Sequence, residues 1–139
     1  MFHGVPKSVV LASLLGLIPI LMGLVSTFNI SLNAGLKKDF IRIALIYSGF
    51  ILSFMSGCIF YVASLERDRV LLLWFSITPV LLALLSITIS FMQSFVLALG
   101  FLVVLEIERK LHKLRSLPDW WLKLRFPMTS IVVILLVFL

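Results

Sequence analysis

Charged residues are what this sequence has least of. Only 13% of its 139 residues are charged, whereas 62% are apolar and the mean hydropathy is +1.22. Soluble domains are roughly a quarter charged and about half apolar, and even a well-packed domain of about 150 residues leaves roughly 30% of its chain surface in water. A soluble fold of this size is therefore excluded, and lipid must solvate most of the surface.

Cysteine and acidic residues are also scarce. Cys58 is the only cysteine, which excludes an internal disulfide and argues against a cysteine-based metal centre. All six Asp and Glu lie at or beyond the ends of the apolar runs, whereas proton-coupled transporters place such groups near mid-membrane. His112 and Asp119, seven residues apart, specify no reaction. The sequence predicts no catalytic residue, no metal site, no cofactor and no enzymatic activity.

Long apolar runs predict an all-α, polytopic membrane helix bundle that forms one domain over residues 1–139. The first run, residues 8–28, has no charge and would span about 31 Å as a helix, which matches a bilayer core. We interpret it as a retained span and not as a cleavable signal peptide, because it is long for an h-region and no A-x-A-like site follows. The second span is expected at residues 43–64.

Residues 70–105 form an unbroken apolar stretch that would be about 54 Å long as one helix, which exceeds the whole bilayer. We therefore expect two spans, 70–87 and 91–106, with a turn near 87–94. The alternative is one long tilted helix, which would give four spans in place of five. A last span is expected at 121–139, and it crosses fully only if its helix starts near the two tryptophans.

A basic segment, residues 106–125, precedes the last span. Ile107, Leu111 and Leu114 recur there at helical spacing among charges, which is typical of a helix lying in the interface plane. The net charge of +6 indicates anionic lipid headgroups at this segment and not nucleic acid. The residues expected at the membrane interface, in an aromatic belt or snorkelling, are Trp120, Trp121, Lys123 and Arg125.

Orientation follows from the twelve basic residues. With five spans, one side holds Lys7, Arg67, Arg69, Arg109, Lys110, Lys113, Arg115, Lys123 and Arg125, and the other holds Lys37, Lys38 and Arg42. Basic loops mark the cytoplasm. We expect the N-terminus inside and the C-terminus outside.

Small residues and prolines are the main features of the predicted interior. Gly49, Ser53 and Gly57 recur at every fourth position, so one face of the second span is smooth enough for close helix approach. Packing within the monomer, homo-oligomer contacts and a ligand groove are all compatible with this row. The full set of helix-packing candidates is Ala12, Gly16, Pro19, Gly49, Ser53, Gly57, Ser76, Pro79 and Gly100.

Pro19 and Pro79 lie well inside the first and third spans, where each removes a backbone donor. Broken helices of this kind line substrate sites in transporters. The simpler interpretation is a kink, with Ser76 one turn before Pro79 to satisfy a freed backbone group.

Several phrases occur in an order that resembles a known family. They are GLIP (16–19), YSGFILSFMSG (47–57), WFSITPVLLA (74–83), LALGFLVVL (97–105) and LPDWWLKLR (117–125) followed by Thr129. The chain resembles the small integral membrane proteins called domain of unknown function 3429, to which mitochondrial transmembrane protein 69 is similar. It departs from the family at Ile59, Phe60 and Tyr61, where a Trp and a Gly are usual, and at Pro127. The resemblance implies a bacterial inner membrane, or a mitochondrial one, and brings no activity.

The minimal polar surface and smooth helix faces favour a non-enzymatic bundle that assembles or stabilises another membrane complex through lateral helix contacts. The alternative function is a small oligomeric transporter or channel subunit, with the Pro79 kink and the Gly49 row lining a path. A homo-oligomer or a membrane-protein complex is the expected partner, together with the bilayer itself.

Overall fold

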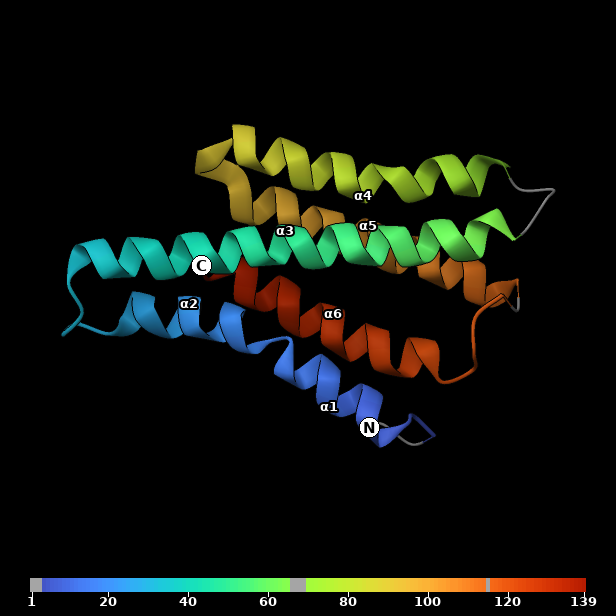
Figure 1. The fold of residues 1–139 in the computed structure, drawn as a ribbon, viewed down its shortest axis with the longest axis horizontal. Helices are drawn as coiled ribbons and strands as arrows, with labels where there is room; N and C mark the ends of the chain where they lie inside the picture. Colours follow the sequence, from blue (N-terminus) through green and yellow to red (C-terminus); the bar gives the residue numbers. More distant parts are fainter. Residues whose placement is uncertain (1–3, 66–69, 115) are drawn as a thin grey trace.

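The computed structural model describes residues 4–65, 70–114 and 116–139, and the regular structure in these ranges is helical (Figure 1). The helices are α1 (Lys7–Leu15), α2 (Ile18–Phe28), α3 (Ala34–Ser64), α4 (Val70–Thr88), a short 3₁₀ turn η1 (Ser90–Met92), α5 (Gln93–Lys113) and α6 (Trp121–Val137). The expected all-α membrane bundle is confirmed. Arg67, Arg69 and Arg115, which entered the orientation argument, lie outside the described residues.

Helix α3 lies at the centre of the bundle and packs against α2, α4 and α5 (Figure 1). Helix α5 is the most buried and packs in turn against α3, α4 and α6. Helix α1 is the exception, because none of its residues is buried and it diverges from the bundle in Figure 1.

The first apolar run is one membrane-length stretch, yet it is two helices. Helix α1 ends at Leu15, and α2 begins at Ile18 with Pro19 as its second residue. Pro19 has no N–H for the carbonyl of Leu15, so this helical hydrogen bond is missing at the break. Gly16 and Leu17 form the break, with the Leu17 N–H donating to Leu14 in a tighter turn.

The apolar stretch 70–105 is divided between α4 and α5, so the alternative of one long tilted helix is wrong. Helix α4 ends at Thr88, Ile89 leaves helical geometry with φ −102° and ψ 67°, and η1 reverses the chain. Neither Gly nor Pro makes this turn. The reversal lets α4 pack against α5, and this packing stabilises the turn.

Two boundaries differ from those expected. Helix α3 begins at Ala34, capped by the Asn33 side chain, which accepts a hydrogen bond from the Gly35 N–H. At 31 residues it is about 46 Å long, so its first turns extend beyond a hydrocarbon core of about 30 Å. The basic segment 106–125 is not one separate in-plane helix, because its first part continues α5 to Lys113 and its last part opens α6.

Four helical stretches of the described chain are long and apolar enough to cross a membrane, which makes this a multi-pass membrane protein. They are Lys7–Phe28, Ala34–Ser64, Val70–Thr88 and Ser90–Lys113. Helix α6 starts at the tryptophans and runs through Pro127. Its 17 residues are about 26 Å long, slightly less than a typical hydrocarbon core.

The tight packing face of α3 is not the row of Gly49, Ser53 and Gly57. The buried residues of this helix are Ala44, Ser48, Leu52, Ser56, Ile59 and Ala63. Gly57 is exposed with open space where a Cβ would be, and a Cβ on Gly49 would make only ordinary contact with Leu97. Each residue of the row follows a buried residue, Ser48, Leu52 or Ser56, by one position, so the row lies beside the face that packs within the monomer.

Two other glycines, Gly23 and Gly100, have no room for a side chain. A Cβ on Gly23 of α2 would lie 2.5 Å from the Ala44 Cβ of α3, and a Cβ on Gly100 of α5 would overlap the side chain of Leu52. Gly100 was among the packing candidates, whereas Gly23 was not. The small residues Gly23 and Ala44 let α2 and α3 approach closely, as is usual between membrane helices, whereas the space at Gly100 is filled by the Leu52 side chain.

Pro79 lies inside a continuous α4 and is buried. The Ser76 hydroxyl does not bond the carbonyl of Phe75, which the proline leaves free, because it donates to Leu73 instead (2.6 Å). The Ser76 carbonyl, in turn, accepts from the Ser56 hydroxyl of α3. The polar groups around this proline therefore tie α3 to α4.

Candidate functional site

Glu108 is a buried carboxylate inside α5, although every acidic residue was expected at a helix end. It continues the buried stripe of this helix, which consists of Leu97, Phe101, Val104, Glu108 and Leu111 at alternating spacings of four and three. Its side chain is 1% exposed. The helical register therefore forces this carboxylate into the bundle, just over one turn before α5 ends.

Arg125 meets this carboxylate from α6. Its Nε donates to both carboxylate oxygens of Glu108, at 2.9 Å and 3.0 Å, and its side chain is only 14% exposed. The expectation that Arg125 snorkels to the interface is wrong, because it lies in the stripe of Met128, Val132 and Leu135, which faces the core. A buried charge tolerates this position only when it is paired.

The pair lies within a group of polar and aromatic side chains. Trp121, one turn before Arg125, lies close enough to Glu108 to interact with it, and Cys58 of α3 lines the same small cavity as both. The Trp121 indole N–H and Arg125 Nη2 are buried without a hydrogen-bond partner among the described residues. Two buried donors thus lie beside the pair without a hydrogen-bond partner in the described part of the chain.

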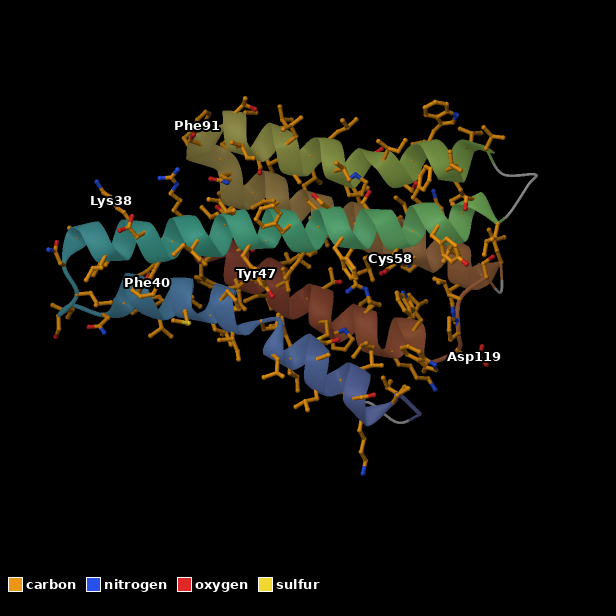
Figure 2. All side chains as sticks on the ribbon, in the orientation of Figure 1. Lys38, Phe40, Tyr47, Cys58, Phe91 and Asp119 are labelled. Atoms are coloured by element: carbon orange, nitrogen blue, oxygen red, sulfur yellow. The ribbon has the colours of Figure 1, made fainter. Side chains whose placement is uncertain are left out.

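A cavity of about 220 Å³ opens on the other side of Arg125. Its walls come from the α1–α2 break, α3, α5 and α6, and they are lined by Ala12, Ser13, Gly16, Leu17, Tyr47, Ile51, Phe54, Met55, Phe101, Arg125, Met128, Thr129 and Val132. Figure 2 shows Tyr47 and Cys58 on the side of α3 that faces α6. We call this space the Arg125 cavity.

Thr129 is the second polar group of the Arg125 cavity and is 2% exposed. Its hydroxyl has no hydrogen-bond partner among the described residues. Several other helical hydroxyls bond back to their own helix, as Ser48 does to Ala44 (2.8 Å) and Ser130 to Phe126 (2.9 Å). Thr129 is thus a buried hydroxyl left available in a mainly apolar space.

Some residues of this site were predicted from the sequence, and others were not. Ala12 and Gly16 line the cavity, and Pro19 explains the break beside it. Trp120 and Trp121 are partly buried with ring centroids 5.7 Å apart, and Lys123 is exposed. Tyr47, Glu108 and Thr129 were not recognised. The alternating four and three spacing of the buried stripes is the signal that could have identified Glu108.

The polar groups of the Arg125 cavity are suited to binding a hydrogen-bond acceptor. Arg125 Nη2 can only donate, and the hydroxyls of Thr129 and Tyr47 can donate. Within the described residues, no three His, Cys, Asp or Glu side chains come together as a metal site.

Comparison with known proteins identifies the family of this chain. The family model described as Protein of unknown function (DUF3429) matches residues 5–139, which is nearly the full chain. No curated protein and no solved structure matches the chain.

Proposed function

This chain belongs to the DUF3429 family of proteins of unknown function, and we propose that it acts as a non-enzymatic assembly or stabilising factor through lateral contacts with another membrane protein. The surface that makes these contacts is the small-residue row of α3, Gly49, Ser53 and Gly57, with the groove beside it. We place the protein in a bacterial inner membrane, with the end of the bundle that carries Asp119 in the cytoplasm and the end that carries Lys38 outside (Figure 2).

The observation that carries this proposal is that no helix packs tightly on the row within the described part of the chain. Gly57 has open space around it, and Gly49 and Ser53 line an open apolar groove of about 230 Å³ between α3 and α4. Membrane helices associate mainly by close packing of small residues, because lipid tails are as apolar as the side chains. A smooth row beside a groove is the kind of surface that a partner helix can fill.

The groove is also lined by Phe50, which is 68% exposed and lies next to Gly49. Its wall on α4 is apolar, with Val80, Ala83 and Leu84. An apolar transmembrane helix with small residues on one side matches this surface in shape and chemistry.

A photo-crosslinking experiment tests the proposal. The photoreactive amino acid p-benzoylphenylalanine replaces Phe50 in one variant and Phe28, which is 72% exposed on α2, in a control. We expect an adduct with one membrane protein from position 50 and none from position 28. Gly57→Leu should abolish the adduct and leave the chain folded, because the new side chain enters open space in the monomer. An adduct that survives Gly57→Leu refutes the proposed surface.

A transporter is the second candidate function, favoured by the break between α1 and α2 beside Pro19. Discontinuous helices with freed backbone groups line substrate paths in several transporter folds. Adducts formed only between two copies of this chain, together with solute flux in liposomes containing the purified protein, would favour this function over the assembly role.

A further inference from the structure

Two of the residues that line the Arg125 cavity carry buried hydrogen-bond donors without a partner among the described residues, and the rest of the wall is mainly apolar. Thr129 Oγ1 and Arg125 Nη2 are both buried and unpartnered among the described residues. Tyr47 brings another hydroxyl, whose oxygen lies 3.7 Å from the position of a Gly16 Cβ. Each unmade hydrogen bond to a buried group costs stability, so a ligand that bonded these two groups from the cavity would recover this cost.

The cavity opens towards lipid. Its floor is formed by buried side chains, Phe101, Met128 and Val132, whereas Ala12 of α1 and Phe54 of α3 line it from exposed positions. Helix α1 buries none of its residues, so little packing closes this side. A molecule dissolved in the bilayer can enter here without crossing the polar ends of the bundle.

Charge decides which acceptor fits. Glu108 and Arg125 already form a neutral pair, with both carboxylate oxygens bonded to Nε. An anionic ligand would bring a second negative charge into a buried space beside Glu108, which is costly in a low-dielectric site. A neutral carbonyl oxygen accepts the same hydrogen bonds without this cost.

We propose that the Arg125 cavity binds a neutral lipophilic molecule, whose carbonyl oxygen accepts hydrogen bonds from Arg125 Nη2 and the Thr129 hydroxyl after these two side chains turn toward the cavity. An apolar cavity of roughly 150 Å³ suffices for benzene, so about 220 Å³ holds a ring-sized head group or a short acyl segment with its ester carbonyl. Both sources share the same chemistry, a carbonyl oxygen on an apolar body.

Binding to the purified full chain in detergent tests the proposal, measured by native mass spectrometry and by the ligand-induced rise in Tm. The probes are a decyl-substituted benzoquinone, a short-chain diacylglycerol, decanoic acid at neutral pH, and decylbenzene, which has no acceptor. We expect the quinone, the diacylglycerol or both to bind more tightly than decanoic acid and decylbenzene, and the stronger of the two identifies the source of the carbonyl. Equal binding of decylbenzene, tighter binding of the acid, or no binding of either carbonyl probe would overturn the proposal.

Two variants make the test specific to the site. Thr129→Val keeps the side-chain volume and should weaken binding of the carbonyl probe by about tenfold, as expected for one buried hydrogen bond. The ligand-free variant should be at least as stable as the wild type, because the lost hydroxyl has no partner within the described chain. Thr27→Val is the matched control, since this hydroxyl of α2 already bonds Leu24 (2.6 Å) and does not line the cavity.

Ala12→Phe places a bulky side chain at the exposed mouth without entering the core. This variant should lose binding of all probes while its Tm without ligand stays near that of the wild type. Unchanged binding in both Thr129→Val and Ala12→Phe would show that the probes bind elsewhere and would refute the assignment to this cavity.

Discussion

Removal of the Arg125 guanidinium should destabilise the bundle more than any other single change to a charged side chain in α6. In Arg125→Met, the Glu108 carboxylate loses its counterion and both N–H donations, at 2.9 Å and 3.0 Å, while it stays 1% exposed. Methionine keeps much of the aliphatic stem of arginine, so packing along α6 changes little. The dominant effect is therefore an unpaired buried charge.

The magnitude follows from this geometry. Breaking a buried ion pair by removing one partner typically costs about 3–5 kcal/mol. At roughly 2–4 °C per kcal/mol for a chain of this size, Tm should fall by an amount of order 10 °C. Lys123→Met, an exposed change two residues earlier, should stay within about 0.5 kcal/mol of the wild type.

A double variant separates the unpaired charge from lost packing. Glu108→Leu combined with Arg125→Met replaces the whole pair by apolar side chains, and such replacements are often neutral or stabilising by about 1–4 kcal/mol. The double variant should therefore be more stable than Arg125→Met alone, although it carries one more substitution.

The assay is thermal unfolding in a mild detergent, followed by size-exclusion chromatography and by the fluorescence of tryptophan, since Trp121 lies beside the pair. The reasoning is refuted if Arg125→Met is no less stable than Lys123→Met. It is also refuted if the double variant is no more stable than Arg125→Met.

The remaining predictions concern helix packing. Gly100→Val should lower the free energy of unfolding by about 1–3 kcal/mol, because its side chain overlaps Leu52. Gly57→Ala should change it by no more than about 0.5 kcal/mol, because the site is open. Equal effects of the two variants in thermal unfolding would contradict the packing described here. Ser56→Ala removes the hydroxyl that donates to the Ser76 carbonyl and should cost about 1–3 kcal/mol. Hydrogen exchange should then rise in α4 near Pro79, and unchanged protection there would show that the bond is dispensable.

Much of the fold could be predicted because the length of each continuous apolar segment indicates whether it spans the membrane. The turn between α4 and α5 was expected near 87–94 and occurs at 89–92, since no single helix of 36 residues fits the bilayer. A kink was expected at Pro19, and α1 and α2 are separated there, whereas α4 and α6 continue through Pro79 and Pro127, so the missing N–H of proline permits a break without requiring one. The turn between α4 and α5 depends on one external dimension, the bilayer thickness, so it could be predicted without knowledge of neighbouring helices.

The packing faces could not be predicted in the same way. Gly49, Ser53 and Gly57 form as regular a row as Ala44, Ser48 and Leu52, and both rows lie on α3. The side that faces α2 and α5 is decided by which helices surround α3, and this choice depends on the whole bundle. Gly23 was missed for the same reason, because its importance comes from the approach of Ala44 on another helix.

The sequence by itself determined that the chain lies in lipid, is helical and divides its apolar length into membrane-sized pieces, because the hydrophobic effect and backbone hydrogen bonding act on each segment independently. Only the tertiary structure decided that Glu108 and Arg125 lie in the interior and that Thr129 faces a cavity. Seventeen residues separate the two charged side chains along the chain. They meet because two helices pack with particular faces inward, and that pairing is what makes a buried charge stable there.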